Sequence, residues 1–283
     1  MSAVKMDGKA LSDKVRGSIL AETEALKQRG ITPGLAVIIV GNDPASEIYV
    51  RNKEKACAAC GFYSEKYALP AETTQDELLG LIAQLNESPR ISGILCQMPV
   101  PAHISAQAVI DAIDPRKDVD AFHPVNVGKI MVGDFDFVPC TPAGVMELLA
   151  AYQIDPAGKE CVVIGRSNIV GKPMAMLLLH KHGTVTLCHS RTQGLDEVCR
   201  RADILIAAVG KAGFVTPDMV KDGAVVIDVG INRNAAGKVC GDVDPAVMEK
   251  ASYMTPVPGG AGPMTITMLM KNTLKAAKLQ NGL

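Results

Sequence analysis

The chain has 283 residues, of which 48% are hydrophobic and 21% charged, so its composition excludes a disordered chain and its length suits two domains of ~100–150 residues. Its formal net charge is −1 and its Lys and Arg residues are scattered, so we expect no nucleic acid and no anionic lipid as partners. The opening "MSAVKMDGKALS" has no apolar signal core and no apolar run reaches the ~18 residues of a membrane span, which predicts a soluble cytoplasmic protein without a membrane partner.

The first 120 residues alternate short apolar runs with amphipathic stretches. "LAVIIVG" (35–41) predicts a buried strand, "SEIYVRNKEKACAAC" (46–60) a helix entered through Ser46, and "ISGILCQ" (91–97) a second strand. Between them, Thr74 and Glu77 have the spacing of a capping box at the start of another helix. This part of the chain is therefore predicted to be an α/β unit.

Eight cysteines lie at irregular spacings, which indicates reduced thiols more than a secreted disulfide framework. Cys57 and Cys60 form the only close pair. A redox or zinc site would require a strand-to-helix turn or a second pair with suitable spacing, and the sequence has neither. We interpret the two residues as small core residues of a helix, and we predict no metal site.

The second half begins after a Pro-dotted stretch (122–142), which we interpret as the passage between two domains, with Thr141 as a helix N-cap and Pro142 at the first helical position. A helix from about residue 171 follows the first of several apolar strands, which are predicted at 160–165, 184–190, 202–210 and 223–230. Near-continuous apolar strands separated by helices indicate a parallel sheet covered on both faces, in a Rossmann-like order. A last helix is predicted at roughly 264–280, and the sequence leaves open whether it packs back on the first domain.

"GRSNIVG" (165–171) resembles a dinucleotide-binding turn that has lost a glycine. Gly165 and Gly171 enclose the turn from a strand into a helix, where backbone N–H groups and the helix dipole can receive a pyrophosphate. Ser167 stands at the place of the usual middle glycine, and we expect its hydroxyl to add a donor. The alternative is an ordinary turn without a ligand, but its position at the head of four β–α units favours nucleotide binding.

The next strand ends in "CHSRT", with Ser190 and Arg191 where a site that prefers NAD has an acidic residue. Arg166 adds a second cation near the same edge. Because a 2′-phosphate requires cations and donors, we predict NADP as the cofactor, with solvated surface charges as the alternative interpretation of both arginines. The predicted fold is thus α/β, with an N-terminal α/β substrate domain followed by a Rossmann-like NADP-binding domain whose sheet is mainly parallel.

Tyr49 and Lys53 lie four residues apart and share one helix face. That face is otherwise small and apolar, so we expect the Lys53 amine to be available as a base or a water-activating group near neutral pH. A tyrosine packed beside a surface lysine is the alternative interpretation. Gln97 ends a strand, at the sheet edge where ligands gather, and Asp120 falls at the predicted domain junction.

Long motifs in this order resemble the bifunctional methylenetetrahydrofolate dehydrogenase/cyclohydrolase family over essentially the whole chain. They are "VGNDPASEIYVRNKEKAC", "GILCQMPVP", "KDVDAFHPVNVG", "PCTPAGV", "VVIGRSNIVGKPM", "VIDVGIN", "GDVD" and "TPVPGGAGPMT". The sequence departs from the family pattern at Ala121, where glycine is frequent, and at Ala261, where valine is usual. Neither departure removes a functional group.

The resemblance implies a folate-binding catalytic domain (1–121), an NADP-binding domain (122–283) and a homodimer. It implies that hydride passes from 5,10-methylenetetrahydrofolate to NADP+, and that water opens the resulting methenyl cation to 10-formyltetrahydrofolate. It makes Lys53 the key catalytic group, with Gln97 bonded to it, Tyr49 against the folate ring and Asp120 on the pterin edge. Further substrate contacts are expected from Gly259, Gly260, Gly262 and Pro263, and a further cofactor contact from Ile231.

Two other functions remain open on the sequence alone. An NADP-dependent enzyme similar to shikimate dehydrogenase also places a substrate domain with a lysine first, although "YVRNK" and "GILCQMPVP" are not its pattern. A sensor that binds NADP without turnover is the non-enzymatic alternative, against which the presence of Lys53, Gln97 and Asp120 counts.

Overall fold

The computed structural model describes residues 2–283, except for the side chains of residues 44 and 45. By their internal contacts the residues form two units. The six-stranded unit contains residues 2–13 and Thr141–Thr265, and the three-stranded unit contains Lys14–Cys140 and Ile266–Leu283. The sequence placed the boundary at residue 121, whereas residues 122–140 lie in the three-stranded unit and the first residues lie in the other.

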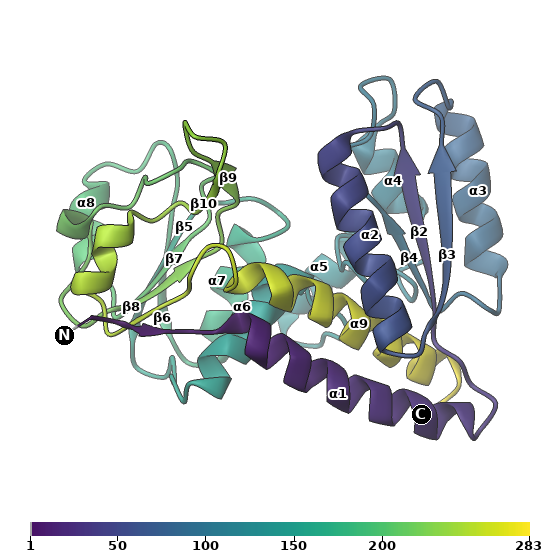
Figure 1. Cartoon of the computed structure of the whole chain (residues 1–283), viewed down its shortest axis with the longest axis horizontal. Coiled ribbons are helices and arrows are strands. Elements are labelled where there is room, and N and C mark those ends of the chain that lie inside the picture. Colours follow the sequence, from purple (N-terminus) through teal and green to yellow (C-terminus); the bar gives the residue numbers. More distant parts are fainter. Residues whose placement is uncertain (1) are drawn as a thin grey trace. The chain divides into compact units, whose positions relative to one another are not determined.

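The three-stranded unit is built on a parallel sheet with the strand order β3-β2-β4 (Figure 1). Its strands are β2 (Gly34–Val40), β3 (Tyr63–Leu69) and β4 (Gly93–Cys96). Every residue of the central strand β2 is buried, as its uninterrupted apolar sequence predicts. The unit's own helices are α2 (Pro44–Ala59), α3 (Gln75–Glu87), α4 (Ala106–Ala112) and α5 (Pro124–Val132).

Helix starts in this unit follow local capping chemistry. The Asp43 carboxylate accepts the Ser46 N–H at 2.8 Å, so α2 begins two residues before the predicted Ser46. Thr74 and Glu77 form the predicted capping box at the start of α3. The Pro-dotted stretch is not a plain connection, because it contains α5 and the start of α6 (Cys140–Ala151). The expected N-cap Thr141 lies inside α6, where its hydroxyl is 3.0 Å from that of Thr265.

Two long helices, α1 (Gly8–Lys27) and α9 (Ala261–Gln280), enter the three-stranded unit at Lys14 and Ile266, and from there they lie side by side (Figure 1). Arg16 on α1 donates to the Thr267 hydroxyl on α9 at 2.9 Å. The Asn272 amide of α9 donates to the Val119 carbonyl at 2.8 Å. The later part of the last helix therefore packs against residues of the first half of the chain.

The six-stranded unit has a parallel sheet with the order β1-β11-β8-β7-β5-β6. Its strands are β1 (Val4–Lys5), β5 (Glu160–Ile164), β6 (Thr184–Cys188), β7 (Ile204–Ala207), β8 (Val225–Asp228) and β11 (Tyr253–Met254). Besides α6 it contains α7 (Gly171–His180), α8 (Leu195–Arg200), two 3-10 turns (Pro217–Met219 and Pro245–Glu249) and a hairpin of β9 (Asn232–Arg233) and β10 (Val239–Cys240). The predicted α/β class with mainly parallel sheets is confirmed.

The register aligns the strand ends at one edge of each sheet. In the six-stranded unit, Ile164 at the end of β5 is opposite Cys188 of β6 and Ala207 of β7. In the three-stranded unit, Cys96 at the end of β4 is opposite Ile38 of β2. Residues that follow these strands are therefore brought together at the carboxyl edge of their sheet, where ligands of open α/β sheets bind.

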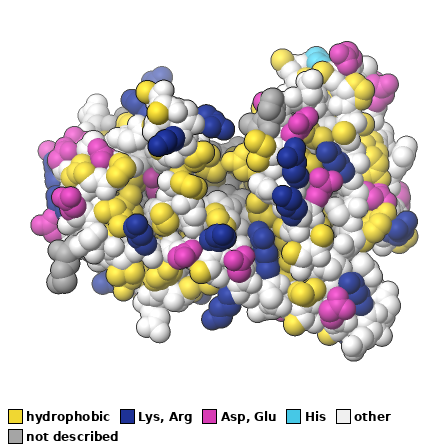
Figure 2. All heavy atoms as spheres, in the orientation of Figure 1, with side chains coloured by type: hydrophobic (Ala, Val, Ile, Leu, Met, Phe, Trp, Pro, Cys, Tyr) yellow, Lys and Arg dark blue, Asp and Glu magenta, His cyan; other side chains and the backbone are white. Residues whose placement is uncertain are grey.

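The surface mixes both signs of charge over the face shown in Figure 2, without a large area of one sign. Among the described residues, no helix combines the length and the apolar character that crossing a membrane requires.

Candidate functional site

Lys53 and Gln97 lie at the centre of the predicted catalytic residues in the three-stranded unit. The Lys53 ammonium on α2 donates to the Gln97 Oε1 at 2.8 Å. The Gln97 Nε2 donates to the Met98 carbonyl at 2.8 Å, so the amide is held with its oxygen toward Lys53. The Gln97 backbone N–H continues the sheet by donating to Ile38. Gln97, which orients the Lys53 amine, is thus positioned by the end of a strand and is hydrogen-bonded at both its amide oxygen and its amide nitrogen.

Asp120 belongs to the same group. Burial raises the pKa of its carboxyl group, while the nearby Lys53 charge lowers it. The Cys140 thiol donates to Asp120 Oδ1 at 3.6 Å and to the Val119 carbonyl at 3.5 Å. Burial keeps the pKa of Cys140 well above its ordinary value, so the thiol remains a donor. Sequence reasoning quoted "PCTPAGV" but gave Cys140 no role, because its contact with Asp120 spans 20 residues of chain.

The loop that carries Asp120 is held by a buried neighbour. The Asp118 carboxylate accepts the backbone N–H groups of Phe122 and His123 at 3.2 and 2.8 Å, and the Asn126 amide at 2.8 Å. Ala121 adopts a φ of 58°, in the left-handed region that favours glycine. The positive φ explains why glycine is frequent at position 121 in the family, a reason that the sequence alone did not show.

Tyr49 lies one turn before Lys53 on α2, and its side chain is 38% exposed. It shares the helix face with Lys53, as its spacing predicted. Among the described residues, the hydrogen bonds of Lys53, Gln97 and Asp120 do not include Tyr49. Its expected contact with a folate ring therefore stays a prediction.

Gly165 and Gly171 are required by the packing of the loop between β5 and α7. Gly165 has a φ of 121°, and a Cβ there would lie 2.1 Å from the Ala208 carbonyl oxygen. A Cβ at Gly171 would lie 1.9 Å from the Gly165 carbonyl oxygen. The Ser167 hydroxyl oxygen accepts the N–H groups of Val170 and Gly171 at 3.1 and 3.3 Å, and because its own O–H can still donate, the expected donor stays a prediction. The loop still has the close backbone packing of a phosphate-binding turn.

Arg166, Ser190 and Arg191 are exposed and follow the ends of the adjacent strands β5 and β6. Neither guanidinium has a hydrogen bond or an ion pair within residues 2–283. The Arg191 N–H donates to the His189 Nδ1 at 3.2 Å, which shapes the turn after β6. Two cations without internal partners thus stand on neighbouring loops at the edge where the glycine loop lies. Ile231, 54% exposed, follows β8 in the same unit.

The expected substrate segment near the end of the chain has three different glycines. Gly259 has a φ of 108°, and a Cβ on Gly260 would lie 2.6 Å from the Pro256 carbonyl oxygen. Gly262 is in the first turn of α9, and beyond its chain neighbours and the backbone of its own helix no described atom lies within 4 Å of the place that a Cβ would take there. The Pro263 carbonyl accepts the Ser12 hydroxyl at 3.4 Å. Backbone conformation and packing therefore explain why residues 259 and 260 are glycines. Of the three glycines, only Gly262 is not required by the packing of the protein itself.

Cys57 and Cys60 are fully buried at the end of α2. Burial raises the pKa of Cys57 to about 12 and that of Cys60 to about 11. Both are therefore protonated at neutral pH and pack as small core residues.

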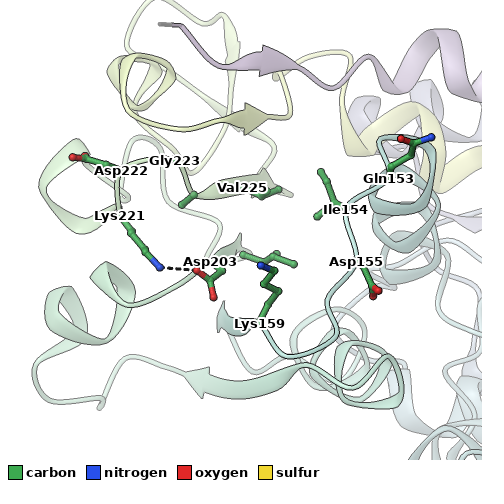
Figure 3. A pocket seen from close by; sticks show the side chains of 11 residues that line it. Gln153, Ile154, Asp155, Lys159, Asp203, Lys221, Asp222, Gly223 and Val225 are labelled. Atoms are coloured by element: carbon green, nitrogen blue, oxygen red, sulfur yellow. Dashed lines mark hydrogen bonds and ion pairs between the residues drawn. The ribbon is translucent and has the colours of Figure 1, made fainter.

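A cavity of about 430 Å³ lies at the opposite edge of the six-stranded sheet, where β5, β7 and β8 begin (Figure 3). Lys221 and Asp203 form an ion pair at 2.6 Å on its wall, and Lys159 and Asp155 line the other side. None of the site residues predicted from the sequence lines this cavity.

Comparisons with known proteins agree over both units. Residues 6–120 match the family model described as "Tetrahydrofolate dehydrogenase/cyclohydrolase, catalytic domain", and residues 139–281 match the corresponding "NAD(P)-binding domain". The chain is 63% identical over 281 residues to a protein named "Bifunctional protein FolD" from Acetivibrio thermocellus, with 99% of each chain covered.

Solved structures extend this similarity to the fold. A bifunctional methylenetetrahydrofolate dehydrogenase/cyclohydrolase from Campylobacter jejuni has a TM-score of 0.97 at 50% identity, with 99% of this chain and 100% of that chain covered. The Trypanosoma brucei enzyme, solved with NADP cofactor and inhibitor, has a TM-score of 0.95 at 40% identity, with both chains fully covered. A shikimate dehydrogenase from Aquifex aeolicus, with a TM-score of 0.51 at 14% identity, shares the fold alone.

Proposed function

Because the chain belongs to the tetrahydrofolate dehydrogenase/cyclohydrolase family, we propose that it is a bifunctional enzyme that oxidises 5,10-methylenetetrahydrofolate and hydrolyses the product. The observation that carries the proposal is the 2.8 Å hydrogen bond between Lys53 and Gln97, with Asp120 close to the same side-chain nitrogen. We assign the catalytic role to the three-stranded unit and nucleotide binding to the six-stranded unit. This replaces both the shikimate and the sensor alternatives.

In the first reaction, bound NADP+ would supply the acceptor for a hydride from the methylene carbon. The close packing at Gly165 and Gly171 gives the loop a backbone that a pyrophosphate can approach. Arg166, Ser190 and Arg191 would receive the 2′-phosphate, because the two guanidinium groups have no partners among the described residues and charge-assisted bonds to phosphate are strong. Ile231 would pack against the same cofactor.

In the second reaction, water adds to the methenyl carbon and Lys53 in its neutral form takes the proton. The resulting hydroxyl group then loses its proton and becomes the formyl C=O as the bond from that carbon to N5 breaks, and N5 takes up a proton, which gives 10-formyltetrahydrofolate. Gln97 holds the amine in place, since its oxygen accepts from Lys53 and its nitrogen is bonded to Met98. A neutral amine is also easier to accommodate beside a cationic substrate than an ammonium.

Asp120 would bind the N–H donors of the pterin edge, with Tyr49 against the folate ring. The Cys140 thiol, which donates to Asp120, orients that carboxylate. Gly259, Gly260, Gly262 and Pro263, which belong to the six-stranded unit, would add contacts to the substrate. Homodimer formation and a cytoplasmic location are further parts of the proposal, and both rest on the family.

A spectrophotometric assay with 5,10-methylenetetrahydrofolate, run with NADP+ and with NAD+, tests the first reaction, and added methenyltetrahydrofolate tests the second. Lys53→Met should lose hydrolysis by about 100-fold or more while NADP+ still binds, because general acid–base groups contribute that much. Lys55→Met is the matched control, since Lys55 is exposed on the same helix. Unchanged hydrolysis in Lys53→Met, or no turnover by the wild type, would overturn the proposal.

A further inference from the structure

Two motifs of the sequence, "VIDVGIN" and "GDVD", form one interlocked structure in the six-stranded unit. The Asp228 carboxylate accepts the N–H groups of Gly230, Asp242 and Val243 at 2.9 to 3.0 Å. A Cβ on Gly230 would lie 2.3 Å from the Asp242 carboxylate, and one on Gly241 would lie 1.8 Å from that of Asp228. Each glycine thus makes room for the aspartate of the other motif.

The Asp242 carboxylate is fully buried and has four donors. Its Oδ2 accepts the N–H groups of Val209 and Gly210 at 2.6 and 3.0 Å. Its Oδ1 accepts the N–H of Lys211 and the amide of Asn232, both at 2.8 Å. No cation pairs with it among the described residues. Hydrogen bonds from successive backbone amides therefore compensate a buried negative charge.

The segments bonded to Asp242 lie beside the nucleotide loop. Residues 209–211 follow Ala208, whose carbonyl oxygen occupies the space that a Cβ on Gly165 would need. Asn232 follows Ile231, the exposed residue expected to contact the cofactor. Loops at a sheet edge have few apolar contacts of their own, so their conformation depends on such bonds.

We infer that Asp242 is a positioning residue for dinucleotide binding, which acts by holding residues 209–211 and Asn232 in the conformation that completes the cofactor site. The inference rests on the proposed function. Asp242 itself contacts no ligand, because both of its oxygens are occupied by protein donors.

Asn232→Ala and Asp242→Asn test the inference in the full-length chain. Asn232→Ala removes one of the four donors and leaves the three backbone bonds, so it should fold. We expect its Kd and KM for NADP+ to rise roughly tenfold, as for one lost hydrogen bond to a charged group, while kcat changes less than about twofold. In Asp242→Asn, which replaces an acceptor by a donor, hydrogen exchange of residues 209–211 should also become faster.

Asn234→Ala is the matched control, because the Asn234 side chain stabilises the tip of the same hairpin by accepting from Ala236 and Lys238. Its Kd for NADP+ should stay within about twofold of the wild type, since the lost bonds lie outside the loops that Asp242 holds. Wild-type affinity in Asn232→Ala, or equal weakening in both hairpin variants, would overturn the inference while leaving the proposed function intact. A wild type that does not bind NADP+ would overturn both.

Discussion

Replacement of Asp228 by Asn tests the electrostatics of the six-stranded unit through the pH dependence of its stability. Burial raises the pKa of Asp228 from 3.8 to about 6, although three backbone N–H groups favour its charged form. The folded chain therefore holds this proton more tightly than the unfolded chain does. The stabilisation from the group is fully present below about pH 3.8 and is lost as the pH rises through about 6.

The full effect is about 3 kcal/mol, because each pH unit between the two pKa values corresponds to about 1.4 kcal/mol. Asp228→Asn has no proton to lose at this position. Between about pH 4 and pH 7, the free energy of unfolding of the wild type should therefore fall by about 2–3 kcal/mol relative to that of the variant. Urea unfolding at half-unit pH steps, followed by circular dichroism, measures this difference directly.

Asp203→Asn is a control of opposite sign in the same unit. The hydrogen bond from Lys221 at 2.6 Å holds the pKa of Asp203 below its ordinary value. Stability from this group is present above the unfolded pKa and is lost as the pH falls, so the wild type should lose stability relative to Asp203→Asn on acidification. The reasoning would be refuted if the difference in the free energy of unfolding between the wild type and Asp228→Asn did not change across this pH range. It would also be refuted if that difference changed with pH in the same direction as the difference between the wild type and Asp203→Asn.

Three further predictions concern the candidate ligand sites. Arg191→Ala should weaken NADP+ roughly tenfold more than NAD+ in binding titrations, and equal losses would show that Arg191 does not contact the 2′-phosphate. Gly165→Ala should abolish measurable NADP+ binding and lower the free energy of unfolding by about 2–4 kcal/mol, because the Ala208 carbonyl must move to make room for the new Cβ. Retained affinity for NADP+ would contradict the close packing at this position. Gly262→Ala should raise the free energy of unfolding by about 0.5–1 kcal/mol, measured by thermal unfolding, while dehydrogenase activity falls. Full activity in this variant would show that Gly262 is not part of the substrate site.

The parts of the site that one strand end or one helix places could be predicted from the sequence. Gln97 follows a short apolar run, and Lys53 lies one helical turn after Tyr49, so both could be located from periodicity alone. The glycine loop could be predicted for the same reason, because it joins an apolar strand to a helix. The contact between Lys53 and Gln97 required the register of β2 with β4, which no local pattern encodes.

Elements held by distant partners escaped prediction. β1 has two exposed residues and exists because Val4 and Lys5 pair with Tyr253 and Met254 near the other end of the chain. Helix α5 was not predicted, because the prolines of its stretch were interpreted as signs of a connecting segment. Pro124 is nevertheless compatible with a helix, since it stands at the first helical position, where no N–H is needed for a backbone hydrogen bond. The two compact units differ from the predicted domains for a similar reason, since α1 and α9 are distant in sequence and contact each other only in the folded chain.

Asp228 and Asp242 show a further limit of sequence reasoning with a consequence for function. An aspartate after a strand usually indicates a ligand contact at the carboxyl edge of a sheet, and both residues have that position or lie next to it. Yet together they accept seven N–H groups of the protein, and Gly230 and Gly241 are glycines because carboxylates fill the space beside them. Each oxygen of the Asp242 carboxylate already accepts two protein N–H groups, and the Asp228 carboxylate is buried beside Gly241, so neither is available to a ribose. Under the proposed function this edge would offer arginines and backbone amides to a dinucleotide, while these two carboxylates hold the loops, which is consistent with a preference for the extra phosphate of NADP.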